Sequence, residues 1–409
     1  MPALADSLAG WTASLEPDAD DLTLARRALL DTVAVAAAAR DAPEGRALDP
    51  LLEPLGQAGR WAALAHVLDF DDLHLPSTTH VSAVCVPVVL ACGGGARDYL
   101  AGAGAMVRLG AALGWSHYSA GWHATCTAGA PAAAVAAASA LGLDAERTAA
   151  AIALAVPAAG GVQRAFGTSA KSLQVGFAAD AGVRAARLAA AGASADPAAL
   201  EQWLALVGGD LGASEPARGL LDPAGPAVPD GLAIKLHPCC YALQRPIAAV
   251  RALREREPAL RAERVRRIRV TTPESALQPL IHHRPRTGLE GKFSLEYGVA
   301  AALLDDYPDL ASFADEAVRR PEAQRLVEAL EAATTPGGDG LLAGEVAIEL
   351  MLDDGTVHST SLALPPGAPA RPPTEAELAA KLAACTRAAG TAEPLANLTW
   401  STASGVLPT

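Results

Sequence analysis

Cysteine is scarce in this chain, with six residues in 409, no Cys-X-X-Cys spacing and one adjacent pair, Cys239 and Cys240. A disulfide scaffold needs a much higher density, so that class is excluded. The N-terminus reaches Asp6 before any apolar run and has no basic segment, unlike a signal peptide. We therefore expect reduced thiols in a cytoplasmic protein.

Positive charge and long apolar runs are also lacking. Lys and Arg number 32 against 45 acidic residues, and the resulting net charge of −13 repels a phosphate backbone. The most membrane-like stretch, 128–143, is shorter than the ~20 residues that a spanning helix needs. We expect neither nucleic acid nor a membrane as a partner, and the 51% of hydrophobic residues can build a large core.

Several catalytic motifs are absent as well. The chain has no Walker loop, no HExxH and no GxSxG. Gly102 and Gly104 begin a dinucleotide fingerprint, but Val107 occupies the place of its third glycine and the surrounding pattern is helical. These absences disfavour nucleotide, zinc-peptidase and serine-hydrolase chemistry.

The first half of the chain is patterned as helices. Apolar residues recur at helical spacing in six stretches: 22–39, 81–90, 128–143, 148–156, 175–191 and 200–207. Gly142 is placed to end the third helix, and Asp144 to cap the fourth. We predict a large helical domain over residues 1–233.

The pattern changes after a loop rich in Pro, Gly and Asp at 222–230. Alternation of apolar and polar residues predicts one strand at 265–272 and a hairpin around Asp354-Gly355. Two further stretches, 294–304 and 321–333, are patterned as helices. We predict a smaller α+β domain over 234–371. Thr374 and Glu377 then form a capping-box pair that opens a helix ending near Gly390, so residues 372–409 would return to complete the helical domain.

Polar residues form five islands in this apolar chain. The first runs from Asp69 to His80 and is either a catalytic or metal-binding loop or a solvated loop that caps the next helix. The second surrounds His123, directly before the Ala-rich helix. A helix N-terminus disfavours protonation, so His123 is either a neutral base or an ordinary capping residue.

The other three islands hold single lysines or a tyrosine. Lys171 lacks an acidic residue nearby in sequence until Asp180, and Lys235 falls at the predicted domain junction, where small-molecule sites concentrate. The alternative interpretation is that Lys171 is simply solvated and that Lys235 is a boundary lysine without a function. Tyr297, in the island at 284–297, lies within one helical turn of Ser294 and beside apolar residues. A core tyrosine is its default interpretation.

The order of these islands resembles a known family. The segments are DFDD (69–72), His80, GWHATCTAG (121–129), GTSAKSLQVG (167–176), KLHPCCY (235–241) and RPRTGLEGKFSLEY (284–297). Together they resemble the MmgE/PrpD family, which includes 2-methylcitrate dehydratase, cis-aconitate decarboxylase and iminodisuccinate epimerase. The resemblance spans about residues 20–310.

This resemblance implies a mainly α fold with a smaller α+β lid, an active site between them, a homodimer, and no metal or organic cofactor. The implied cleft residues are Asp69, His80, His123, Lys171, Lys235 and Tyr297. The chain departs from the usual family pattern at Leu73, Gln174 and Gln244-Arg245. Such departures change which anions a cleft can hold.

We therefore expect a cofactor-independent lyase of the 2-methylcitrate dehydratase type. It would abstract a proton from a small di- or tricarboxylate or related acid and eliminate water, with His123 as base and His80 or Tyr297 as acid. Lys171, Gln174, Lys235 and Arg245 would hold the substrate. Neither His123 nor Lys235 lies in an apolar stripe, so alanine there is expected to cost about 1 kcal/mol or less in stability.

Other activities stay open from the sequence. Decarboxylation and epimerisation begin from the same proton-handling cleft. A metal-dependent hydrolase would instead use the first island, with Asp69, Asp71, Asp72, His74 and His80 as ligands. A non-catalytic binding protein is the third class.

Overall fold

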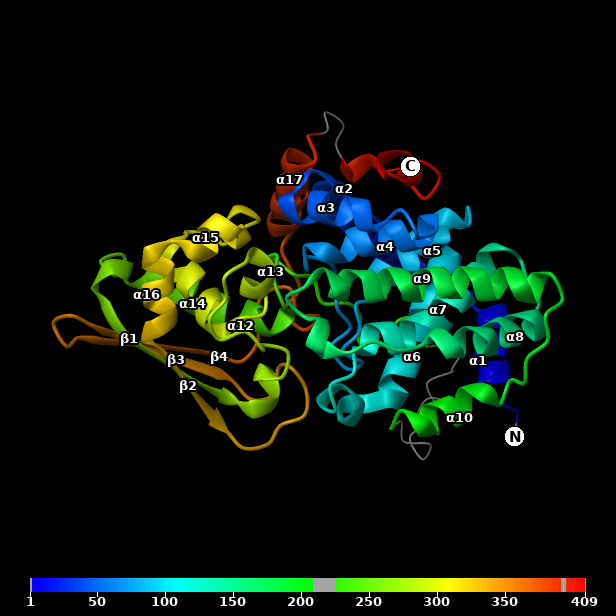
Figure 1. The fold of residues 1–409 in the computed structure, drawn as a ribbon, viewed down its shortest axis with the longest axis horizontal. Coiled ribbons are helices and arrows are strands. Elements are labelled where there is room, and N and C mark those ends of the chain that lie inside the picture. The colour runs from blue at the N-terminus through cyan, green and yellow to red at the C-terminus, as the bar shows by residue number, and fades with distance from the viewer. Residues whose placement is uncertain (1, 209–224, 391–394, 409) are drawn as a thin grey trace.

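The computed structural model describes residues 2–208, 225–390 and 395–408. The chain is mostly helical, with a smaller part that contains a four-stranded sheet (Figure 1). The predicted fold class is confirmed. Within the described residues, no helix has both the length and the apolar character needed to cross a bilayer.

The helical part is built around two long helices, α7 (Ala124–Ala140) and α9 (Ser169–Ala190), which pack against each other. Alanine and glycine allow the close approach, because a methyl group added at Gly182 would lie 2.3 Å from Cβ of Ala133. The surrounding helices are α1 (Leu4–Ser14), α2 (Ala19–Asp41), α3 (Pro43–Leu48), α4 (Gln57–Val67), α5 (Ser82–Ala91), α6 (Ala96–Ser119), α8 (Ala145–Ala155) and α10 (Ala199–Leu206).

Local sequence signals explain several helix ends. The Asp144 side chain accepts a hydrogen bond from the Arg147 amide, as predicted for the start of α8. Gly142, at φ +69°, stands just beyond the end of α7. The would-be dinucleotide fingerprint at Gly102 and Gly104 lies inside α6, where it cannot form a phosphate-binding turn.

The smaller part contains one mixed sheet in the order β2-β1-β3-β4. Strand β1 (Val265–Pro273) pairs in parallel with β2 (Leu330–Thr335) and antiparallel with β3 (Val346–Leu352), which forms a hairpin with β4 (Val357–Leu362). Helices α12, α14 and α16 lie beside the sheet (Figure 1). The helices here are α12 (Tyr241–Arg256), α13 (Gly288–Gly291), α14 (Leu295–Leu304), α15 (Asp315–Arg319) and α16 (Pro321–Ala329).

One predicted helix is wrong over its last four residues. The helix expected over 321–333 ends at Ala329, and residues from Leu330 form β2. Leu330 pairs with Ile268 of β1, so the open edge of β1 recruits a segment whose alanine and glutamate composition favours a helix locally. Tertiary pairing therefore outweighs local propensity at this point.

The C-terminal segment returns to the helical part. Helix α17 (Glu375–Ala388) begins at the predicted Thr374–Glu377 capping box and packs on α2 (Figure 1). Its Lys381 forms a buried ion pair with Asp31 at 2.6 Å. The Trp61 indole also donates a hydrogen bond to the Pro408 carbonyl at 2.7 Å. The tail thereby joins the main core.

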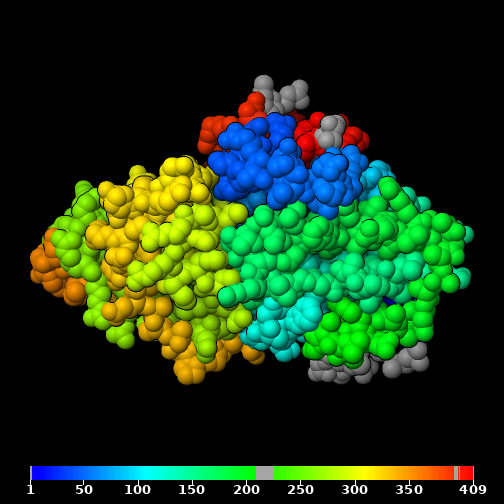
Figure 2. All heavy atoms as spheres, in the orientation of Figure 1, coloured from blue at the N-terminus to red at the C-terminus, as the bar shows by residue number. Residues whose placement is uncertain are grey.

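The described residues hold two large hydrophobic cores. One combines the helices up to Val228 with the tail, and the other lies between the sheet and its helices. The domain limits at 234 and 371 stay a prediction. In the face shown in Figure 2, side chains of the two parts meet along their junction. Short 3-10 helices connect the elements, at Asp49–Leu51, Val156–Ala158, Gln163–Ala165, Ala262–Arg264, Glu274–Leu277, Ala311–Phe313, Leu395–Asn397 and Ala403–Val406.

Candidate active site

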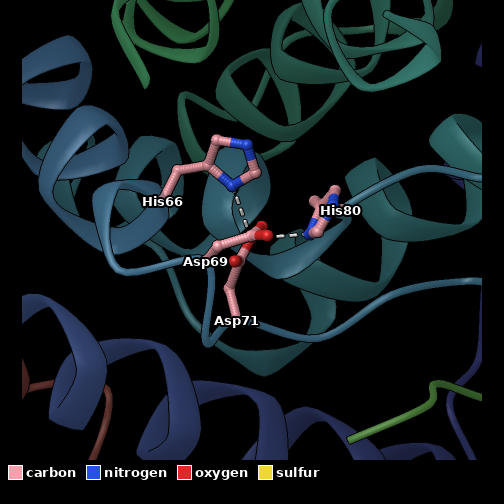
Figure 3. Close-up of side chains that lie close together, drawn as sticks. All are labelled: His66, Asp69, Asp71 and His80. Carbon is pink, nitrogen blue, oxygen red and sulfur yellow. Dashed lines mark hydrogen bonds and ion pairs between the residues drawn. The ribbon is translucent and has the colours of Figure 1, made fainter. Parts of the chain in front are cut away.

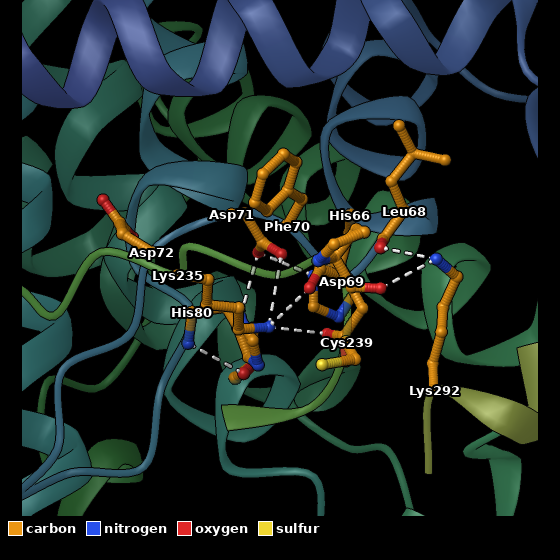
Figure 4. Close-up of polar contacts among 12 residues, drawn as sticks. His66, Leu68, Asp69, Phe70, Asp71, Asp72, His80, Lys235, Cys239 and Lys292 are labelled. Atoms are coloured by element: carbon orange, nitrogen blue, oxygen red, sulfur yellow. Dashed lines mark hydrogen bonds and ion pairs between the residues drawn. The ribbon is translucent and has the colours of Figure 1, made fainter. Parts of the chain in front are cut away.

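The site is organised by the loop that follows α4. Helix α4 ends at Val67, and Asp69 turns the chain with φ +51°. The next carbonyls cannot bond within the helix, and a helix C-terminus carries partial negative charge that attracts cations. Each of three successive carbonyls accepts a hydrogen bond from a different lysine. Leu68 accepts from Lys292 at 3.1 Å and Asp69 from Lys235 at 3.0 Å (Figure 4). Phe70 accepts from Lys381 at 2.8 Å.

The Asp69 carboxylate joins two of the predicted residues. Its Oδ1 accepts hydrogen bonds from Lys171 at 3.0 Å and from Lys235 at 2.9 Å. Burial alone would raise the pKa of Asp69, but the two ammonium groups outweigh it and hold that pKa below its ordinary value. In the same way, burial would lower the pKa of Lys235, but Asp69 and Asp71 raise it. Asp69 is therefore ionised and Lys235 is protonated.

Asp71 lies between two imidazoles (Figure 3). Its Oδ2 is 2.7 Å from Nδ1 of His66 and 3.0 Å from Nδ1 of His80. Burial would raise the pKa of Asp71, but His66, His80 and Lys235 lower it well below its ordinary value. Burial also lowers the pKa of His66, and it lowers that of His80 to about 3. Both imidazoles are therefore neutral near pH 7.

The tautomer of His66 follows from its two partners. The Lys171 ammonium donates to Nε2 of His66, so the ring proton lies on Nδ1 and is donated to Asp71. His66 thus connects Lys171 with Asp71. The His66 ring also lies 4.6 Å from the His80 ring and 5.8 Å from the His123 ring.

His123 immediately precedes α7, as predicted, but its side chain does not cap the helix. Burial, with a smaller effect from Lys171, lowers the pKa of His123 well below its ordinary value. The expected neutral imidazole is thus obtained mainly by exclusion of water. Nδ1 lies 3.2 Å from the Cys126 thiol, and Nε2 has no hydrogen-bond partner in the described part of the chain.

A small cavity of about 20 Å³ lies between the two parts of the molecule. His80, His123, Lys171 and Asp69 reach it from the helical part, and apolar rings close it. Its other lining residues are Leu73, Thr78, Tyr118, Phe166, Cys240, Tyr241, Phe293 and Leu341. Two neutral imidazoles, an ammonium group and a carboxylate therefore meet in a narrow space among largely buried side chains.

Both domain models of one known family match this chain. The MmgE/PrpD N-terminal domain model matches residues 52–207, and the MmgE/PrpD C-terminal domain model matches residues 237–398. This chain belongs to the MmgE/PrpD family. It is also similar to cis-aconitate decarboxylase from Aspergillus terreus and from A. terreus strain NIH 2624 / FGSC A1156. Each is 28% identical over 366 residues, which cover 79% of this chain and 73% of the relative.

Four residues predicted for the site do not line its cavity in this MmgE/PrpD chain. Lys235 lies behind it, bonded to Asp69. The other three have partners elsewhere. The Tyr297 hydroxyl donates to the Ser312 carbonyl inside the smaller part. Gln174 accepts from the Val162 amide at 2.9 Å. The Arg245 guanidinium is buried against carbonyls at Ala343 and Gly344, where it ties α12 to the loop before β3. The sequence around Tyr297, Gln174 and Arg245 did not indicate these hydrogen-bond partners.

The predicted metal ligands separate into two groups. His74 bonds to Ser77 and to the Pro229 carbonyl, and Asp72 bonds to Ser82. The other three predicted ligands, Asp69, Asp71 and His80, lie together with His66, which was not predicted. One ligand atom from each of these four residues lies within 4.8 Å of the others. This set has the chemistry to hold a divalent cation. The ammonium groups of Lys171 and Lys235 already supply positive charge there.

Two site residues escaped the sequence analysis. His66 lies three residues before Asp69, inside an apolar helix where a histidine is readily taken for a core residue. Tyr241 follows the Pro-Cys-Cys segment directly and starts α12. Its place directly after this recognised motif, at the start of a helix, could have marked Tyr241 as a candidate site residue.

The expected low cost of Lys235→Ala does not fit this environment. Lys235 is fully buried, and its removal would leave the Asp69 carboxylate with one ammonium fewer. Breaking a buried ion pair typically costs about 3–5 kcal/mol, well above the surface range. His123 is buried as well, and its ring packs against Phe166.

Proposed function

We propose that this MmgE/PrpD chain is a lyase that acts on a small di- or tricarboxylic acid and begins by abstracting a proton next to a carboxylate. The observation that carries the proposal is the cavity shared by His123 and Lys171. An unprotonated imidazole whose Nε2 has no partner among the described residues can accept a proton there, and an ammonium group lies ready for the adjacent carboxylate.

The chemistry explains why both groups are needed. Loss of a proton beside a carboxylate places further negative charge on oxygens that are already anionic. A preorganised cation in a dry site stabilises that charge far better than water does. Lys171 supplies this cation, Asp69 and His66 orient it, and His123 takes the proton.

His80 is suited to handle a second proton. It is neutral, lines the same cavity and is held by Asp71, which can stabilise the imidazolium that forms when His80 accepts a proton. Because His80 starts neutral, the proton that turns the departing hydroxide into water is the one taken from carbon, passed on by His123 or by His80. Elimination of water is therefore our first candidate for the overall reaction.

Loss of carbon dioxide is the second candidate, favoured by the similarity to cis-aconitate decarboxylase. The rings of Phe166 and Phe293 lie beside the Lys171 ammonium, each at 5.3 Å, and make that wall of the cavity apolar. Transfer of a carboxylate from water into such surroundings removes its hydration, which promotes loss of carbon dioxide. The electron pair of the broken carbon–carbon bond is left on carbon and takes up a proton, and solvent deuterium would enter at that carbon.

The cavity must widen for any such substrate. A volume of about 20 Å³ accommodates roughly one water molecule. Phe293, Tyr241 and Leu341 belong to the smaller part, whereas Lys171 and His123 belong to the helical part. Separation of the two parts would therefore open the site, and their closure would expel water around the bound acid.

The test is nuclear magnetic resonance of the purified protein with a panel of di- and tricarboxylic acids in deuterated water. We expect deuterium to enter one acid at the carbon next to a carboxylate, and the product to identify the leaving group as water or carbon dioxide. His123→Gln is the matched control and should abolish exchange. Absence of exchange and conversion with every acid would refute the proposal.

A further inference from the structure

We propose that the Tyr241 hydroxyl contacts the substrate and donates a hydrogen bond to the carboxylate beside the reacting carbon. This inference rests on the proposed function, because it assigns a role within the same cavity. Tyr241 begins α12, is 1% exposed, and lines the cavity together with His123 and Lys171. It comes from the smaller part of the molecule, whereas those two residues come from the helical part.

The hydroxyl of Tyr241 is buried and has no hydrogen-bond partner among the described residues. A buried polar group without a partner is costly, and native structures satisfy nearly all such groups. Three other tyrosines in this chain follow that rule: Tyr99 bonds to Ser82, Tyr297 to the Ser312 carbonyl and Tyr307 to the Leu236 carbonyl. The Tyr241 hydroxyl therefore obtains a hydrogen-bond partner only when a ligand enters the cavity.

The ring of Tyr241 is held by apolar neighbours. It belongs to a small cluster with Leu73, Tyr118 and Leu341, separate from the two large cores. These contacts fix the ring while leaving the hydroxyl unsatisfied. Binding of a carboxylate would supply the missing acceptor, so the group is arranged for a ligand rather than for folding.

The hydroxyl is suited to be a donor. Burial raises the pKa of Tyr241, so the phenol keeps its proton throughout the working pH range. When His123 takes the proton from the substrate carbon, the electron pair of that bond moves toward the adjacent carboxylate and its oxygens gain charge. Tyr241 strengthens its hydrogen bond to one of them without transferring its own proton, and Lys171 meets the charge from the opposite part.

The test is Tyr241→Phe, which keeps the ring and removes only the hydroxyl. We expect kcat to fall by about 10²–10³-fold, as for other donors to a developing oxyanion, with KM changed by only a few fold. We expect Tm to be unchanged or higher, because an unpartnered buried hydroxyl is removed. A merely structural role would give the reverse, a lower Tm with normal kcat.

Tyr307→Phe is the matched control. It also removes one tyrosine hydroxyl, which donates to the Leu236 carbonyl at 2.9 Å and does not line the cavity. Its kcat should stay within about twofold of the wild type. If Tyr241→Phe retains wild-type kcat on a substrate that the wild type converts, the role of Tyr241 is wrong and the proposed function survives. If the wild type converts no acid, both fail.

Discussion

Lys171 and Lys235 donate hydrogen bonds to the same carboxylate oxygen of Asp69, at 3.0 and 2.9 Å. The chain has only four lysines, and all four are buried around the loop at residues 68–71. Two like charges are tolerated at one oxygen because Asp69 and Asp71 balance them. Charge compensation in this loop is therefore a condition both for folding and for presenting Lys171 to the cavity.

Asp69→Asn should destabilise the protein strongly. The amide has the same shape but leaves two buried ammonium groups facing a neutral partner, which predicts a loss of about 3–5 kcal/mol in the free energy of unfolding. Urea unfolding measures the change. Asp180→Asn serves as the control, since that carboxylate only caps the start of α4 through Gly56 and Gly59 and should cost about 1 kcal/mol. Equal losses in the two variants would contradict the charge-balance argument.

His123→Gln should reduce kcat by about 10²–10⁴-fold, because glutamine cannot accept the proton. The similar size of the new side chain limits the loss of packing against Phe166. His358→Gln is the control, since His358 lies on β4 outside the cavity. Kinetics and melting temperatures on the same preparations check the prediction, and near-normal kcat in His123→Gln would remove it from the mechanism.

Stability should fall as the pH drops below about 6.5. The pKa of His80 is lowered to about 3, so the unfolded chain binds a proton at pH 4–6 that the folded chain does not bind. Stability contributed by the neutral imidazole is present above the unfolded pKa and is lost as the pH falls toward the folded pKa. His80→Gln should therefore flatten the dependence by about 1.4 kcal/mol per pH unit. Chemical unfolding at pH 6, 5 and 4 measures both slopes. Parallel slopes would show that His80 is protonated in the folded protein.

Tyr297→Phe should affect stability rather than chemistry. Its hydroxyl donates to the Ser312 carbonyl, and removing that donor leaves the buried carbonyl without this hydrogen bond. A loss of about 1–3 kcal/mol in unfolding free energy is expected, with kcat close to the wild type. A large fall in kcat at unchanged Tm would instead restore the acid role that we expected for His80 or Tyr297 from the sequence.

Removal of metal ions should leave activity unchanged. The four ligand atoms of His66, Asp69, Asp71 and His80 lie close enough to bind a cation, but Lys171 and Lys235 already hydrogen-bond within this set. Assays of protein dialysed against a strong chelator, with and without added divalent ions, check this. Loss of activity on dialysis that one metal restores would favour the hydrolase alternative.

Sequence reasoning succeeded where the signal was local. Asp144 and the Thr374–Glu377 pair act as helix caps, because capping depends on residues three positions apart. The hairpin at Asp354-Gly355 was also predicted correctly, because alternating patterns flank a turn sequence on both sides. Strand β2 was mistaken because its pairing with β1 is more than 60 residues distant in sequence.

The sequence by itself determined the fold class and the family resemblance. It also predicted five site residues that the structure brings close together: Asp69, His80, His123, Lys171 and Lys235. Those conclusions depend on periodicity and on the order of short motifs, both of which are local properties. Only the tertiary structure decided that Tyr241 rather than Tyr297 reaches the cavity, and that Arg245 and Gln174 bond elsewhere. The physical reason is that a hydroxyl, guanidinium or amide bonds to whichever polar atom folding brings within about 3 Å. Such neighbours come from segments far apart in the chain.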